Sequence, residues 1–187
     1  MQLQIYKISH PIVKLISSRI NNKYMSHIDQ RQCEKYAGFL IIYEIFRKYI
    51  SIENVYIKLT EGTKIVEIID TKKRYVLLAD ISNTYNMLTD ITSITSNFEL
   101  HHVNYENKNE IKNYVKNIYS NNSNISIFII EKITKNYKII NLIEYLVKEK
   151  KFSLDNISIC NIFSSSGILK EIGQKYPKLK IYTTKIE

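Results

Sequence analysis

The sequence contains no tryptophan and very little glycine, proline, alanine or cysteine. Among its 187 residues are four glycines, two prolines, two cysteines and two alanines. Cys33 and Cys160 lie far apart and neither belongs to a CxxC motif, so we expect packed, reduced thiols rather than disulfides or a zinc site. So little glycine also leaves little material for loops that bring backbone amides against a phosphate.

Long hydrophobic runs are missing as well. The longest apolar runs are about four residues, whereas a membrane span needs roughly 18. The N-terminus, MQLQIYKISHPIVKLI, resembles neither a secretory signal nor an import peptide. We therefore expect no membrane partner and a protein that acts where it is made. The 44% hydrophobic and 24% charged residues are ordinary for a globular domain.

Isoleucine (35), asparagine (18), tyrosine (15) and lysine are abundant in place of the scarce residues. These types share A/T-rich codons, so the lysine excess partly reflects base composition. The net charge of +9 could indicate nucleic acid, but only four of the 27 Lys and Arg residues are arginine. The basic clusters at 72–74 and 148–151 contain no aromatic residues. We expect no specific nucleic-acid binding and retain it only as an alternative.

Periodicity predicts one α/β domain, 1–187, with N-terminal helices and a hairpin over 1–70 and an alternating core over 71–187. The alternation indicates a mostly parallel sheet with helices on both faces. The first part comprises a strand at 3–8, a break at His10-Pro11, a helix at 26–50 capped by Ser26, and a hairpin over 54–70 turning at 61–63. The core comprises strands at 75–79, 98–103, 125–130, 156–162 and 179–183, helices near 82–95, 107–120, 136–150 and 165–175, and a loop at 121–124.

Several blocks in order resemble the uracil phosphoribosyltransferase family. They are HPIVKLISSRI (10–20), AGFLIIYEIFRKYI (37–50) and ISICNIFSSSGILKEIGQKYPKLKIYTTKIE (157–187). No single block is specific, but their order and spacing over nearly the whole chain are. The matching positions are Tyr43-Glu44, Gly167-Ile168, Pro177, Tyr182-Thr183 and Ile186-Glu187.

The resemblance implies a type I phosphoribosyltransferase fold and a reaction. In that reaction uracil attacks the anomeric carbon of phosphoribosyl pyrophosphate, which gives UMP and pyrophosphate. Such enzymes need a carboxylate and a glycine-rich loop for the 5-phosphate. They also need basic groups and usually magnesium for the pyrophosphate, and a pocket that recognises the edge of uracil.

The family's phosphate loop, similar to Val-Asp-Pro-Met-Leu-Ala-Thr-Gly-Gly-Ser, corresponds here to IIEKITKNYK. Glu131 falls on the aspartate, and Thr134, Lys135 and Asn136 are at most weak remnants of the phosphate-binding part. Tyrosine and lysine cannot replace glycines where the backbone must contact phosphate. We therefore interpret this segment as a former phosphate loop that no longer binds phosphate. Glu131 is either a retained catalytic carboxylate or a solvated strand-end carboxylate, and we favour the second.

The lysines beside this loop have two possible roles. Lys132, Lys135 and Lys138 could attract an anion as point charges. Without convergent backbone donors, we favour a weakly held, exposed cluster that binds no anion firmly.

The pyrophosphate side also departs from the family pattern. The family's ILRAGLGMMDG stretch corresponds to DISNTYNMLTD (80–90), where Met87-Leu88 match the apolar pair. Ile81 or Ser82 stands in place of the arginine, and both glycines are missing. The family continues past the final strand into a Pro-Gly-x-Gly-Asp segment that reads uracil, and we expect that segment to be absent after Glu187.

Two further candidates have ordinary explanations. His101 and His102 are adjacent on a strand and point to opposite faces, which argues against a shared metal site. The SSSG stretch (164–167) lacks a nucleophile elbow and is more typical of a helix cap. We therefore expect no catalytic residue beyond the remnant Glu131, no metal ligand and no cofactor, although the family would imply magnesium.

The sequence thus predicts a degenerate, truncated homologue of the family that is catalytically silent. Alternatives are an active enzyme with a rebuilt site for a phosphoribosyl substrate, and a basic nucleic-acid-associated protein. We expect a homodimer through the N-terminal half, because apolar residues between 39 and 46 exceed one core-facing stripe. The hairpin folding over the second face is the alternative. Relatives in red-algal plastid genomes and the A/T bias suggest a plastid protein, or otherwise a bacterial cytoplasmic one.

Overall fold

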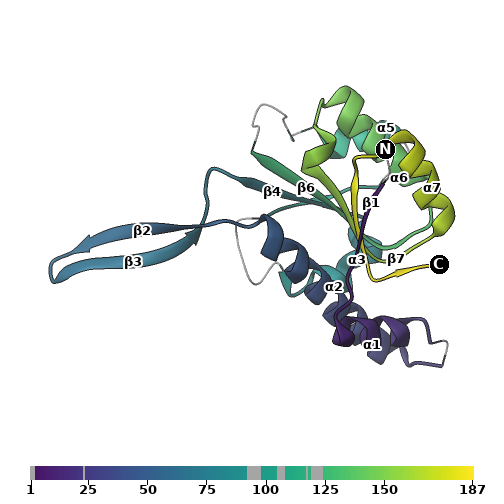
Figure 1. Ribbon diagram of the computed structural model, residues 1–187, viewed down its shortest axis with the longest axis horizontal. Coiled ribbons are helices and arrows are strands. Elements are labelled where there is room, and N and C mark those ends of the chain that lie inside the picture. The colour runs from purple at the N-terminus through teal and green to yellow at the C-terminus, as the bar shows by residue number, and fades with distance from the viewer. Residues whose placement is uncertain (1–2, 23, 92–97, 105–107, 117, 119–123) are drawn as a thin grey trace.

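The computed structural model describes residues 3–22, 24–91, 98–104, 108–116, 118 and 124–187 (Figure 1). Its N-terminal part consists of β1 (Gln4–Lys7), α1 (Pro11–Ile20), α2 (His27–Tyr49), β2 (Ile52–Leu59) and β3 (Gly62–Ile69). The core follows with β4 (Arg74–Ala79), α3 (Ile81–Leu88), β5 (Phe98–His102), α5 (Lys108–Tyr114), β6 (Ile125–Thr134), α6 (Lys138–Glu144) extended by a π-helical turn (Tyr145–Glu149), a 3₁₀ turn (Leu154–Asn156), β7 (Ile157–Ser164), α7 (Ser166–Lys175), β8 (Lys180–Thr183) and β9 (Lys185–Ile186).

The central sheet has the strand order β1-β8-β7-β6-β4-β5, and β9 pairs with the end of β7. Every pairing described in this sheet is parallel. Helices α1, α2 and α3 pack against one face, and α5, α6 and α7 against the other. The prediction of a mostly parallel α/β sheet with helices on both faces is confirmed.

The two cores follow from the alternation of side chains along each strand. In β4, Val76 and Leu78 face the core under α5–α7, whereas Tyr75 and Leu77 face α1–α3. The strands β4 and β7 are buried almost throughout because helices cover both their faces. These two layers hold the carboxyl ends of the strands in fixed positions.

Helix α2 begins where the sequence predicts, since the Ser26 hydroxyl accepts a hydrogen bond from the Asp29 amide at 3.1 Å. Helix α1 lies within the part predicted to hold N-terminal helices, but no bounds were predicted for it. Pro11 opens it as its first residue, where a missing N–H does no harm, and the His10 side chain accepts from the Ile12 amide. The predicted helix at 82–95 is shorter than expected, because α3 ends at Leu88. The predicted tail at 92–95 and the loop at 121–123 lie outside the described residues.

The expectation of an exposed second apolar face on α2 is wrong for most of its residues. Ile41, Ile42, Ile45 and Phe46 are all buried within the chain, and Phe39 and Leu40 are half-buried. Packing by α1 and α3, in addition to the sheet, covers this helix. The hairpin is not the cover, because β2 and β3 project away from the body as a two-stranded arm (Figure 1) and are mostly exposed.

Candidate functional site

The sheet has a switch point between β4 and β6. These two strands are neighbours, yet the chain leaves β4 toward β5 on one side and continues from β6 toward β7 on the other. The helices that follow them, α3 and α6, lie on opposite faces. Such points open a crevice at the carboxyl ends of the strands. A polar cavity of about 460 Å³ lies there, lined by Glu34, Asp80, Ser82, Asn83, Thr84, Asn86, Asn104, Glu131, Lys132, Ile133, Asn136 and Lys138.

Glu131 lies inside this site, but not as a solvated strand-end carboxylate. The strand β6 continues to Thr134, four residues beyond its predicted end, and its residues pair with β7. Glu131 is 7% exposed and accepts a hydrogen bond from the Thr134 hydroxyl. Our interpretation of Glu131 as solvent-exposed is therefore wrong, and the carboxylate is part of a buried polar network.

That network continues across three strand ends. The Asn161 amide nitrogen donates to the hydroxyl oxygen of Thr134 at 2.6 Å and to that of Ser164 at 2.8 Å. The Ser164 hydroxyl lies 3.0 Å from the Asn161 amide oxygen and 3.3 Å from the Thr183 hydroxyl oxygen. All four residues are fully buried. Buried polar groups that satisfy one another fix side-chain positions, so these strand ends form a rigid floor.

In the connection from β6 to α6, the backbone amides form hydrogen bonds with groups of the same segment. The Asn136 side-chain oxygen accepts a hydrogen bond from the Lys138 backbone amide at 3.0 Å. The backbone carbonyl of Asn136 accepts one from the Ile139 amide at 3.3 Å. The Ile140 amide donates to the Tyr137 carbonyl at 3.0 Å. These are the amides that a phosphate at a helix N-terminus would need. Asn136 therefore occupies the position that an anionic ligand would take. The structure describes no contact between Lys135 and this site.

Lys132 does not belong to an exposed cluster, contrary to expectation. Its ammonium group binds the Glu34 carboxylate, which is 5% exposed on α2. The other Glu34 oxygen accepts from the Asn86 amide of α3 at 3.0 Å. This ion pair ties α2, α3 and β6 together across the cavity. Sequence reasoning missed Glu34, because nothing in its own helix indicates that its partner lies 98 residues away.

Asp80 closes the other side of the cavity as the N-cap of α3. Its carboxylate accepts hydrogen bonds from the Ser82 backbone amide at 3.2 Å and from the Ser82 hydroxyl. It also accepts one from the Asn83 side-chain amide at 2.6 Å. Ser82 thus serves the cap, and Ile81 donates its amide to His102 Nδ1 at 3.2 Å. The two residues that stand in place of the family's arginine, Ile81 and Ser82, are therefore engaged in contacts within the fold.

The remaining candidates have structural roles. His101 Nε2 lies 3.7 Å from Glu99, whereas His102 packs edge-on against Tyr114, so the two histidines have separate surroundings. Ser165 is at the N-cap position of α7 as predicted, but its hydroxyl makes no capping hydrogen bond. Cys160 is buried, which raises the pKa of its thiol, and Cys33 is a half-buried free thiol.

A doubly wound parallel sheet with a polar cavity at its switch point defines an α/β protein. The chain is similar to the solved structure of the AQ2163 protein from Aquifex aeolicus, with a TM-score of 0.70 and 14% identity over 98% of this chain and 88% of that one. The family model for uracil phosphoribosyltransferase matches residues 7–187, and the chain belongs to that family.

Two relatives come from red algae. Each is named a uracil phosphoribosyltransferase homolog, one from Porphyra purpurea and one from Pyropia yezoensis. Both are 27% identical to this chain over its whole length and 89% of their own. No helix among the described residues has the length and apolar character to cross a membrane.

Proposed function

We propose that this family member does not make UMP and that it is retained as a folded binding or structural module. The observation that carries the proposal is the hydrogen-bonded pairing of β6 with β7 as far as Thr134. A phosphate cradle needs backbone that turns its amides toward one point. Here the backbone that follows Glu131 is extended and paired.

The charges of the cavity support the same conclusion. Glu34, Asp80 and Glu131 bring three carboxylates to the lining, against two ammonium groups from Lys132 and Lys138. Lys132 already pairs with Glu34. A phosphoryl dianion placed there would meet like charges at short range. Each lining carboxylate already has a protein donor, and on that ground we propose that magnesium does not bind here. Asp80 caps α3, Glu34 pairs with Lys132, and Glu131 accepts from Thr134. We assign no step to a metal.

The test is a turnover assay with labelled uracil, phosphoribosyl pyrophosphate and magnesium at high protein concentration. We expect no UMP above the blank without protein, because the described residues form no cradle for either phosphate group. Circular dichroism of the same sample checks that the protein is folded. UMP that requires magnesium and is lost in Glu131→Gln would contradict the proposal and support an enzyme with a rebuilt site.

We further propose a homodimer through the N-terminal half, supported by apolar surface on the hairpin and at its base. Ile52, Tyr56, Leu59 and Ile65 are each more than half exposed. Ile52 also lines an apolar cavity of about 430 Å³ between α2, the base of the hairpin and β5. Ile52, Tyr56 and Ile65 share one face of the ribbon, whereas Leu59 lies on the other. Exposed apolar surface marks interfaces, and a second copy could bury the shared face and the cavity at once.

A plastid location is the proposal that the red-algal relatives and the A/T-rich composition support. Antibodies raised against the protein should label plastids in sections of the source cells. Label confined to the cytosol would contradict this proposal.

A further inference from the structure

The arm formed by β2 and β3 has one face that runs from its tip to the apolar cavity at its base. Residues that lie opposite each other in the two strands, and residues two apart along one strand, point to the same side. The register of β2 against β3 therefore puts four pairs on this face. From base to tip they are Ile52/Ile69, Asn54/Glu67, Tyr56/Ile65 and Lys58/Thr63, and we call this surface the Tyr56 face.

The Tyr56 face is apolar at its base and at its middle. Ile52, Tyr56 and Ile65 are 64%, 64% and 58% exposed. Ile52 and Ile69 also line the apolar cavity beside α2, whereas no residue on the opposite face of the arm does. The Tyr56 face therefore continues into the cavity, and a partner that covers one can also cover the other.

Two charged residues of the Tyr56 face have no partner of their own. Lys58 near the tip and Glu67 near the base form no ion pair and no side-chain hydrogen bond with any residue that the structure describes. They do not reach each other within one arm. Thr63, which lies opposite Lys58, is separated from Glu67 by four residues, or about 13 Å of strand.

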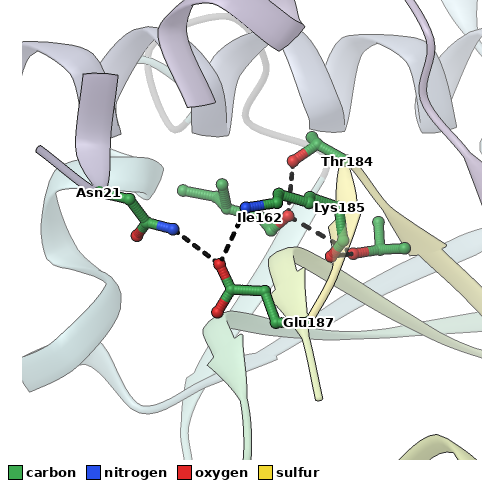
Figure 2. Close-up of polar contacts among 6 residues, drawn as sticks. Asn21, Ile162, Thr184, Lys185 and Glu187 are labelled. Atoms are coloured by element: carbon green, nitrogen blue, oxygen red, sulfur yellow. Dashed lines mark hydrogen bonds and ion pairs between the residues drawn. The ribbon is translucent and has the colours of Figure 1, made fainter. Parts of the chain in front are cut away.

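Charged groups on the body provide a contrast. On the side of the body away from the arm, Glu187 Oε1 accepts a hydrogen bond from the Asn21 amide nitrogen at 2.7 Å and lies 3.4 Å from Lys185 Nζ (Figure 2). The neighbouring Thr184 hydroxyl donates to the Ile162 carbonyl at 2.6 Å. The charges of Lys185 and Glu187 offset each other there, whereas those on the Tyr56 face remain without a partner.

We propose that two copies of the chain pack the Tyr56 faces of their arms against each other, with the arms pointing in opposite directions. This inference rests on the homodimer proposed above and assigns its contact surface. A two-fold axis that passes between the arms at Tyr56 brings Tyr56 and Ile65 of one copy against the same residues of the other. Lys58 and Glu67 lie two residues from this central pair, one toward the tip and one toward the base. Lys58 of each copy therefore lies across from Glu67 of the other.

The charges select this direction of packing. If the two arms pointed the same way, Lys58 would lie beside Lys58 and Glu67 beside Glu67, and like charges in an interface are unfavourable. With the arms in opposite directions, each dimer contains the attractive pair twice. The eight residues of each strand span about 26 Å, so the turn of each projecting arm (Figure 1) reaches the base of the other arm. The apolar cavity at that base then adds to the buried surface.

Sedimentation equilibrium at low salt tests the proposal. Lys58→Glu should dissociate about tenfold more readily than the parent protein, because an attractive pair becomes repulsive twice in each dimer. Glu67→Lys should weaken the dimer in the same way. An equimolar mixture of the two single variants should regain the dimer, because every contact between positions 58 and 67 in a mixed dimer joins opposite charges. Mixing cannot rescue a variant that has misfolded, so this recovery reports on the interface itself.

The matched control is Lys64→Glu, which makes the same change of charge on the opposite face of the same arm. It should dimerise as the parent protein does. A monomeric parent protein would overturn both the homodimer and this packing. A dimeric parent would leave the homodimer standing but overturn the packing in either of two cases: if Lys58→Glu and Lys64→Glu dissociate equally, or if the two single variants stay apart when they are mixed.

Discussion

Gly38 shows how closely the helices around the candidate site approach each other. A Cβ atom at this position would lie 2.5 Å from the Met87 Cα atom and 2.6 Å from its carbonyl oxygen. Helix α2 at residue 38 therefore packs directly against the backbone of α3 at Met87, and there is no room for a side chain at residue 38. This crossing brings Glu34 of α2 within reach of Asn86 of α3, so one glycine positions two residues of the cavity.

Replacing Gly38 with alanine should accordingly destabilise the protein. The added methyl group meets backbone that cannot rotate away, and overpacking of this kind costs about 1–3 kcal/mol. This exceeds the gain in helix propensity of about 1 kcal/mol. Gly167→Ala is the matched control, because its Cβ would lie 3.7 Å from the Tyr137 hydroxyl, an ordinary contact. Urea unfolding of both variants decides the matter, and equal stabilities would contradict the close crossing.

The pair Arg74–Glu99 gives a prediction for pH dependence. Arg74 Nε and Nη2 donate to the two Glu99 oxygens at 2.8 and 2.7 Å, joining β4 to β5. The hydrogen bonds from Arg74 lower the pKa of Glu99 below its ordinary value of 4.5, outweighing the opposing effect of burial. The pair therefore stabilises the fold above about pH 4.5, and this contribution is lost as the pH falls through the lowered pKa.

Arg74→Gln should reduce the free energy of unfolding by about 0.5–1 kcal/mol near pH 7, the range for a pair that remains partly exposed. Between pH 7 and pH 3 the difference between the parent and the variant should shrink, because Glu99 takes up a proton as the pH falls through its lowered pKa. Urea unfolding at both pH values measures this difference. A difference that stays constant or grows toward low pH would show that the pair contributes nothing through charge.

Buried polar residues were the part of the site that sequence could not predict. Asn161 interrupts an apolar strand, and this interruption was the available signal for a hidden network. Its meaning depends on Ser164 of its own strand and on Thr134 of β6, and only the register of β6 against β7 brings Thr134 into contact with it. Glu131 was found by its place in the family pattern, but its burial follows from the same register.

At the level of elements, patterns with strong local signals were predicted well. The capped helix α2 and the hairpin β2–β3 follow from a serine cap and from a turn at Gly62, whose φ of 142° few other residues adopt. The end of β6 was predicted four residues early, because Glu131 and Lys132 look like the start of a loop. Their partners, Thr134 and Glu34, make it favourable for both charged residues to stay in the strand.

At the scale of the whole molecule, the projecting hairpin exposes several large apolar side chains to water. An isolated two-stranded ribbon is marginally stable, yet this arm extends from the body with Ile52, Tyr56, Leu59 and Ile65 exposed (Figure 1). Burying three or four such side chains contributes several kcal/mol, at about 1.5–3 kcal/mol each, before the cost of association. A second copy that packs on the arm would stabilise both the arm and the apolar cavity at its base.

Light scattering at micromolar concentration should therefore give about twice the 22.1 kDa mass of one chain. The double variant Tyr56→Ser/Ile65→Ser should shift the protein toward the monomer, because these residues lie opposite each other on β2 and β3 and are 64% and 58% exposed. Tyr24→Ser/Tyr137→Ser is the control, since both tyrosines are exposed away from the arm. A parent protein of 22 kDa would refute the dimer, and a control variant that dissociates as readily would place the interface elsewhere.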